Sequence, residues 1–209
     1  MLVTLKEILG DAQKGGYAVG AFNVNNMEIV QAIMEAAEEE RSPVILQASQ
    51  GGLKYAGVEY IAAMARLAGE KASVPVAVHL DHGTDFQQIM LCIRNGFTSV
   101  MIDGSQYALD ENIAVTQKVI EVSHAVGVSV EGELGKIGGV EDDVVVADKD
   151  AAMTDPDEAA RFARETGVDA LAISIGTAHG VYKGEPKLDF DRLKAIRDVV
   201  DAPLVLHGA

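Results

Sequence analysis

The sequence has 209 residues, 48% of them hydrophobic, and its 32 acidic against 17 basic residues give a formal net charge of −15. This composition predicts a single globular domain over residues 1–209 and excludes a disordered or fibrous chain. The negative charge repels phosphate backbones and anionic lipid headgroups, so we expect neither nucleic acid nor a membrane surface as a partner.

Cysteine usage and the first residues bear on the cellular compartment. The single cysteine, Cys92, cannot form an internal disulfide, which fits a reducing compartment. Charged residues interrupt residues 1–15 too often for a signal peptide, and no apolar run is long enough to span a bilayer. We therefore expect a cytoplasmic protein.

The elements follow one another in a regular alternation. Leucine and isoleucine at positions 2, 5, 8 and 9 predict a short amphipathic helix that ends near Gly15 and Gly16. After it, short apolar runs predict seven strands, at residues 17–22, 43–48, 75–80, 99–103, 128–134, 169–174 and 203–207. Between them, longer amphipathic patterns predict helices, among them 27–40, 111–126, 155–166 and 189–200.

This alternation predicts parallel strands joined by right-handed helical crossovers. An open doubly wound sheet and a closed (β/α)8 barrel both satisfy it. The barrel is favoured because no glycine-rich dinucleotide fingerprint follows the first strand, and because polar residues repeatedly fall where strands end. Two long connections, 135–155 and 176–188, are typical of functional loops.

The end of the sequence bears on how much of a barrel is present. A barrel of this class usually needs about 250 residues. The seventh predicted strand is followed by two residues only. We therefore expect a (β/α)8 TIM barrel truncated after the seventh strand, with its C-terminal part missing from these residues. A fragment of a longer polypeptide is the favoured explanation over an inactive remnant.

Chemically useful side chains gather where the predicted strands end. Five strands contribute them, in the order Asp81, His82, Asp103, Glu131, Glu133, His179 and His207. Because parallel barrel strands end on one rim, three imidazoles with carboxylates beside them can hold one divalent ion and leave a coordination position open. The pattern predicts a catalytic metal centre, with Asp81 as a general acid or base beside it.

Structural interpretations of the same residues remain open. A histidine taken alone is more often a hydrogen-bonded core residue than a ligand. We expect His79 to be such an interior residue or a group behind the ligands, and His124 to lie on the surface of a helix. The coincidence of three histidines at strand ends favours the metal centre.

The loops around these residues suggest a phosphorylated substrate. The segment "SIGTAHGVYKG" (174–184) is rich in glycine around His179 and ends near Lys183, so its N–H groups can approach an anion. "LHGA" at the end looks like the start of another such loop, and barrel phosphate sites commonly use these loops. Glu141 lies in an acidic run, for which a solvated surface is an equally good interpretation.

Taken together, the motifs resemble one enzyme family. "YAVGAFNVNN", "SPVILQAS", "HLDHG", "GFTSVMIDGS", "VEGELGKIGGVEDD", "GTAHGVYKGEP" and "PLVLHGA" look like the zinc-dependent class II fructose-1,6-bisphosphate aldolases and their tagatose-bisphosphate relatives. The resemblance runs in order from the first residues to the last. It implies a (β/α)8 barrel, usually a dimer or tetramer, that cleaves a ketose bisphosphate into dihydroxyacetone phosphate and glyceraldehyde 3-phosphate.

The resemblance also implies roles for single residues. His82, His179 and His207 would hold the catalytic Zn²⁺, and Asp81 would handle the proton of the C4 hydroxyl. Asp103 and Glu133 correspond to a secondary or alternate metal position, for a second divalent or a monovalent cation. Glu141 corresponds to a mobile-loop carboxylate that transfers a proton at the dihydroxyacetone-phosphate carbon. The substrate contacts would be Ser49 toward glyceraldehyde phosphate and, toward the other phosphate, Gly180, Lys183, Gly208 and Ala209.

The chemistry of the residues agrees with a metal route. A Schiff-base aldolase needs a desolvated lysine on a barrel strand, and none of the seven predicted strands contains one. A metal ion can instead stabilise the enediolate as a Lewis acid. The alternatives are a tagatose-bisphosphate aldolase, a non-catalytic barrel that binds a metal or a sugar phosphate, and a structural barrel with coincidental histidines.

Overall fold

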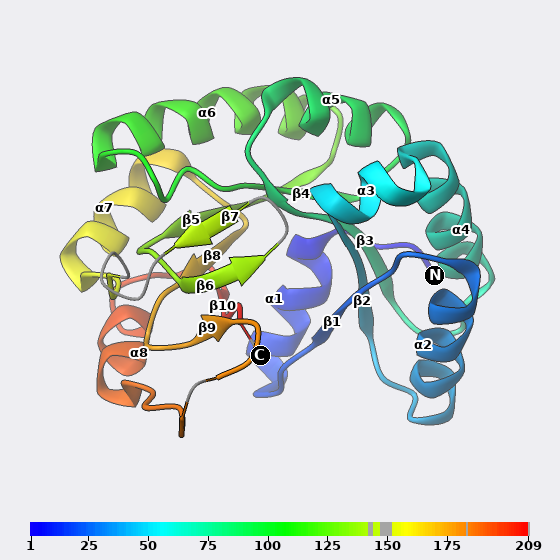
Figure 1. Cartoon of the computed structure of the whole chain (residues 1–209), viewed down its shortest axis with the longest axis horizontal. Coiled ribbons are helices and arrows are strands. Elements are labelled where there is room, and N and C mark those ends of the chain that lie inside the picture. The colour runs from blue at the N-terminus through cyan, green and yellow to red at the C-terminus, as the bar shows by residue number, and fades with distance from the viewer. Residues whose placement is uncertain (142–143, 147–151, 183, 209) are drawn as a thin grey trace.

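The computed structural model describes residues 1–141, 144–146, 152–182 and 184–208. Its main feature is a curled sheet of seven parallel strands that neighbour one another in chain order (Figure 1). These strands are β1 (Gly20–Asn23), β2 (Val44–Ser49), β3 (Val76–Gly83), β4 (Ser99–Ile102), β5 (Ser129–Leu134), β8 (Ala170–Ile173) and β10 (Leu204–Val205). Within the described residues β10 pairs with β8 and not with β1. The predicted parallel (β/α) barrel fold is confirmed, with the seven predicted strands in the described residues.

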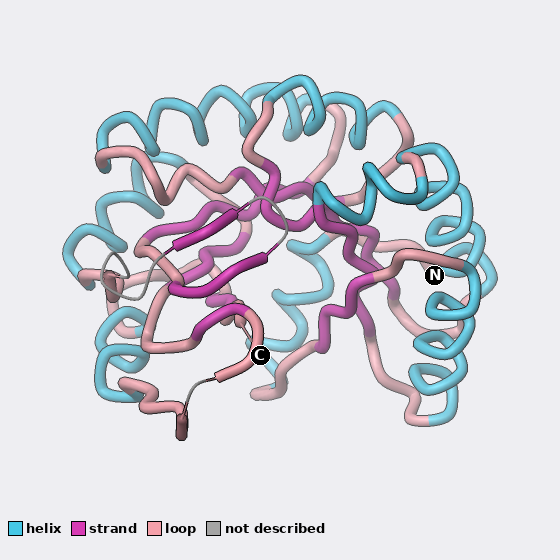
Figure 2. Tube along the Cα trace, viewed as in Figure 1, coloured by secondary structure: helices cyan, strands magenta, loops and turns pink. Residues whose placement is uncertain are grey.

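Helices fill the crossovers and lie outside the curled sheet (Figures 1 and 2). They are α2 (Met27–Glu39), α3 (Gln50–Ala56), α4 (Val58–Lys71), α5 (Phe86–Arg94), α6 (Leu109–Ala125), α7 (Pro156–Thr166) and α8 (Phe190–Arg197). Several begin at an N-cap whose side-chain oxygen accepts a backbone N–H, as Asn26, Asp85 and Asp155 do. In the described ranges, none of the helices combines the length and apolarity needed to cross a membrane.

Helix α1 (Leu5–Gly15) closes one end of the barrel. It begins with a capping box between Thr4 and Glu7. Its buried residues pack in one cluster with side chains from the first residues of three strands, namely Ile45, Ala77 and Ala170. The plugged end is therefore the end where the strands begin, and the strand ends with the polar side chains lie on the opposite rim.

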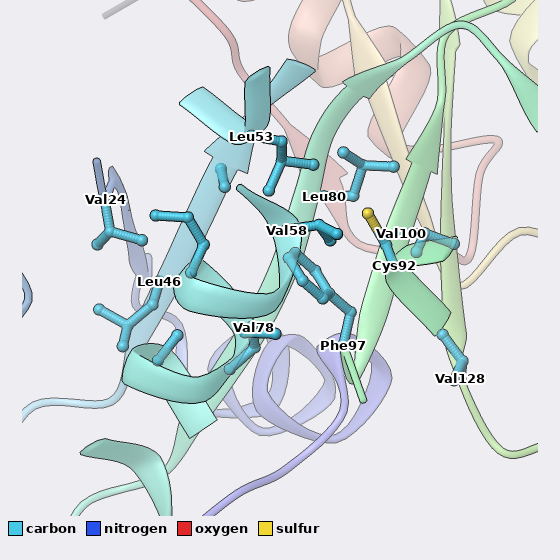
Figure 3. Close-up of a cluster of buried hydrophobic side chains, with 14 of the residues drawn as sticks. Val24, Leu46, Leu53, Val58, Val78, Leu80, Cys92, Phe97, Val100 and Val128 are labelled. Atoms are coloured by element: carbon cyan, nitrogen blue, oxygen red, sulfur yellow. The ribbon is translucent and has the colours of Figure 1, made fainter. Parts of the chain in front are cut away.

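The main hydrophobic core lies between the outer face of the sheet and the helices. In β3, Val78 and Leu80 pack in this cluster with Leu46 of β2 and with Phe97 (Figure 3). Because side chains alternate along a strand, the residues between them face the barrel interior. His79 and Asp81 are such residues, and both are buried. The apolar side chains on one face of β3 thus hold the strand against the helices, while the polar side chains on its other face point into the barrel interior.

The two long connections contain a second, smaller sheet. It comprises β6 (Gly138–Glu141), β7 (Val144–Val146) and β9 (Ala178–His179), with β6 in the middle. The sequence analysis treated both stretches as loops, which is wrong for these residues. The pairing of Gly139 with His179 joins segments from different crossovers, so a local pattern of glycines did not indicate it. In Figure 1 the small sheet lies in front of the barrel strands.

Candidate active site

Three predicted ligands meet at the rim where the strands end. His82 is the next-to-last residue of β3, His179 lies on β9 in the connection that follows β8, and His207 follows β10. Their ring centroids lie 4.9 Å apart for His82 and His179, 4.5 Å for His82 and His207, and 6.3 Å for His179 and His207. One ligand nitrogen from each ring lies within 4.8 Å of the other two. This group could hold one metal ion.

The backbone of β3 explains how two consecutive residues reach one site. In a regular strand Asp81 and His82 would face opposite sides of the sheet. His82 has a positive φ of 46°, and the pairing of β3 with β4 shifts register between Leu80 and Gly83. Such a bulge redirects side chains, and a positive φ at a non-glycine residue costs about 1–3 kcal/mol. Both Asp81 and His82 consequently approach His207.

A second possible metal group shares His82 with two carboxylates. His82 Nδ1 lies 3.1 Å from Asp103 Oδ2 and 3.5 Å from Glu133 Oε2. Burial alone would raise the pKa of Asp103, but hydrogen bonds from His82 and Ser105 hold it below its usual value. Burial and the charge of Asp103 raise the pKa of Glu133 to about 8. A cation bound between the two carboxylates would favour the ionised form of Glu133.

Glu131 supports His207 from behind. The Nε2 of His207 lies 2.8 Å from Glu131 Oε1. Burial would raise the pKa of Glu131, but the hydrogen bond from His207 and the nearby imidazoles lower it. Burial would lower the pKa of His207, but Glu131 raises it to about 9. Because an ionised carboxylate only accepts, Nε2 carries a proton, and a metal ion at this ring would bind Nδ1 after displacing the proton held there.

The other two histidines follow the sequence interpretation. His79 is buried in the barrel interior, with Nδ1 2.9 Å from Ser99 Oγ and Nε2 3.5 Å from Glu131 Oε2. Burial lowers the pKa of His79. His124 is exposed near the end of α6, and its Nε2 lies 2.8 Å from Asp169 Oδ2. His79 therefore lies deeper in the barrel than the rim histidines, and His124 belongs to the opposite end of the barrel.

The Asp81 carboxylate is fully buried and held by a residue that the sequence analysis missed. Gln47 Nε2 donates to Asp81 Oδ2 at 3.0 Å, and Asp81 Oδ1 lies 3.7 Å from His207 Nδ1. The sequence feature that could have identified Gln47 is its polar amide inside the otherwise apolar run "PVILQA". Ser49 pairs in register with Asp81, and its hydroxyl accepts the N–H of Gly52 as the cap of α3.

The predicted phosphate-binding residues are described only in part. Gly180 and Gly208 both have positive φ, of 81° and 78°. Both line a cavity of about 1090 Å³, together with His79, Glu131, His179 and His207. Lys183 and Ala209 lie outside the described residues, and so does the side chain of Glu141, although its backbone ends β6. The same cavity runs from these residues between the edge strands β1 and β10 to α1, which also lines it.

Known proteins share both the sequence and this fold. The family model for fructose-bisphosphate aldolase class-II matches residues 3–209. Fructose-bisphosphate aldolases of Thermus caldophilus and of Helicobacter pylori strain J99 are 54% and 50% identical, each match covering 100% of this chain and 69% of the relative. The crystal structure of the YdjI aldolase from Escherichia coli K12 has a TM-score of 0.88 at 38% identity, covering 100% of this chain and 74% of that one. The chain therefore belongs to the class II fructose-bisphosphate aldolase family, a family of lyases.

Proposed function

We propose that this protein cleaves fructose 1,6-bisphosphate into dihydroxyacetone phosphate and glyceraldehyde 3-phosphate, with Zn²⁺ as its catalytic metal. The relatives' names and the family membership support the reaction. The single observation that carries the proposal is the meeting of His82, His179 and His207 beside the buried carboxylate of Asp81. A structural role for these histidines would not require four ionisable groups to face one point.

The donor set fits a zinc ion. Three imidazoles suit a catalytic site that leaves one coordination position open. The second nitrogen of His82 bonds Asp103 and that of His207 bonds Glu131, an arrangement usual for metal-bound histidine. Zinc, when bound, would supply a Lewis acid for the substrate's carbonyl and hydroxyl oxygens. We propose that the carboxylates of Asp103 and Glu133 form a position for a second divalent or a monovalent cation.

Asp81 is proposed as the acid and base of the reaction. It would take the proton of the C4 hydroxyl as the C3–C4 bond breaks, so that an aldehyde forms at C4 and the bonding electron pair stays with the dihydroxyacetone-phosphate half. The hydrogen bond that Gln47 donates to Oδ2 fixes the orientation of the carboxylate that would receive that proton. Glu141 would then give its own proton to C3, and proton exchange with water would restore both Asp81 and Glu141 for the next turnover.

The remaining assignments concern binding and context. We propose that Ser49 contacts the glyceraldehyde-phosphate half, and that Gly180, Lys183, Gly208 and Ala209 bind the phosphate of the other half. Backbone N–H groups of glycine-rich turns suit a phosphate because no Cβ blocks its approach. We further propose that residues 1–209 form one barrel domain of a cytoplasmic homo-oligomer, a dimer or a tetramer.

Steady-state kinetics on the complete protein test the reaction. We expect cleavage of fructose 1,6-bisphosphate that EDTA abolishes and added zinc restores, and a His82→Ala variant that has lost both zinc and activity. Zinc uptake without any cleavage would instead support a non-catalytic binding barrel. A clear preference for tagatose 1,6-bisphosphate would refute the choice of substrate, and His82→Ala with full metal content would refute the metal site.

A further inference from the structure

The phenol of Tyr182 lies between the two chain segments that carry His179 and His207. The backbone N–H of Ala178 donates to Tyr182 Oη at 3.0 Å, and Tyr182 Oη donates to the carbonyl of Gly208 at 2.7 Å. Ala178 immediately precedes His179, and Gly208 immediately follows His207. One hydroxyl group thus joins the direct neighbours of two of the three histidines.

The sheets do little to fix these two segments relative to each other. Strand β9 has two residues and pairs with β6, whereas β10 ends at Val205 and pairs with β8. Among the residues that the structure describes, no strand pairing joins β9 to β10. The separation of His179 from His207 therefore depends on contacts outside the strand ladders, and the Tyr182 hydroxyl supplies two of them.

The same two segments touch through their backbones. Gly208 has a φ of 78°, and a Cβ built on it would lie 2.7 Å from both the carbonyl carbon and the carbonyl oxygen of Ala178. Only glycine fits this approach without displacing backbone. The Tyr182 hydroxyl bonds the same two residues that touch. It accepts the N–H of Ala178 and donates to the carbonyl of Gly208.

We propose that Tyr182 is a positioning residue, whose hydroxyl holds His179 and His207 at the separation that a shared metal ion requires. This inference rests on the proposed metal-dependent function. Without the hydroxyl, the N–H of Ala178 and the carbonyl of Gly208 lose this partner. Part of the free energy of metal binding is then used to fix His179 and His207 relative to each other, so the measured affinity falls. Partners behind metal ligands typically change metal affinity about 10- to 100-fold.

Tyr182→Phe in the complete protein tests the proposal, because it keeps the ring and removes the hydroxyl. Zinc affinity is measured by competition with a chromophoric chelator, and ligand geometry from the absorption spectrum of the Co²⁺-loaded protein. We expect zinc binding weakened about 10- to 100-fold, an altered Co²⁺ spectrum and a lower kcat. The matched control is Tyr55→Phe on α3, where the side chain is 78% exposed, and it should equal the wild type.

Equal zinc affinity and identical Co²⁺ spectra for Tyr182→Phe and the wild type would overturn the proposal. Should Tyr182→Phe not fold, Gly208→Ala perturbs the same contact and should weaken zinc binding in the same way; unchanged affinity there would also overturn it. Both measurements are made without substrate. A wild type that binds zinc but cleaves no fructose 1,6-bisphosphate would therefore refute the proposed reaction alone.

Discussion

Each end of the barrel holds a buried carboxylate that is hydrogen-bonded to a histidine at 2.8 Å. At the rim where strands end the pair is Glu131 and His207, and at the opposite end it is Asp169 and His124. The His207 side chain is 8% exposed and meets two further imidazoles, whereas that of His124 is 39% exposed. A histidine–carboxylate pair is therefore no evidence of a site until other ligands converge on it.

The pair at the plugged end has a structural explanation that needs no ligand. Asp169 accepts the backbone N–H of Val130 at 2.9 Å, and its other oxygen lies 3.1 Å from Lys6 Nζ. Lys6 belongs to α1, so the carboxylate ties the plug helix to β5 and α6. Every bond of Asp169 thus joins elements of the fold. Glu131 instead connects His207 of the rim with His79 of the barrel interior.

The largest effect that separates the two ends is expected from Asp81→Asn. The substitution keeps the shape of the side chain and removes the carboxylate that we propose accepts the C4 hydroxyl proton. General acid–base groups contribute about 10²- to 10⁴-fold, so kcat should fall by that factor while zinc content stays at the wild-type level. Steady-state kinetics with metal analysis check this. A kcat within twofold of the wild type would exclude Asp81 as the acid and base.

Glu131→Gln and Asp169→Asn make the comparison directly, since each replaces a buried carboxylate by its amide. Glu131→Gln should weaken zinc binding about 10- to 100-fold, because the partner that fixes the proton on His207 Nε2 is changed. Asp169→Asn should leave zinc affinity unchanged. Chelator competition on both variants measures the difference, and equal losses of affinity would erase the distinction between the ends.

Asp169→Asn should act on stability instead. Hydrogen bonds to a charged group contribute about 1.5–3 kcal/mol, and this buried carboxylate loses its charge. We expect a decrease of that size in the free energy of unfolding, measured by urea denaturation of the metal-free protein. An unchanged midpoint would mean that the ties from Asp169 to α1 and α6 contribute nothing net.

Smaller effects are expected at the two partners of Asp169. His124→Ala should cost about 0.5–1.5 kcal/mol, the net value of one hydrogen bond. Lys6→Met should cost about 0.2–1 kcal/mol, because the Lys6 side chain is 71% exposed and water screens the pair. Urea denaturation at low and high salt distinguishes them, since only the ion pair should lose its contribution in salt. A reduced kcat in either variant would contradict a purely structural role for the end of the barrel that α1 closes.

The sequence was sufficient for most of the architecture because apolar runs and helical periodicity are local. The run at 75–80 predicts β3, although the strand continues to Gly83 because its polar last residues still pair with neighbouring strands. The rim histidines could be predicted because strand ends share one edge. The small sheet could not, since Gly139 pairs with His179 across two crossovers. The contact of Gln47 with Asp81 also depends on tertiary pairing of β2 with β3.

The bulge at His82 matters for any attempt to transplant this chemistry into another scaffold. On a straight pleated strand, copied Asp81 and His82 side chains would diverge, one into the barrel and one into the surrounding helices. Gly83 completes the distortion, because a Cβ there would stand 2.5 Å from the carbonyl oxygen of Met101. A successful graft would have to carry the local main-chain path, and an inventory of side chains would not be enough.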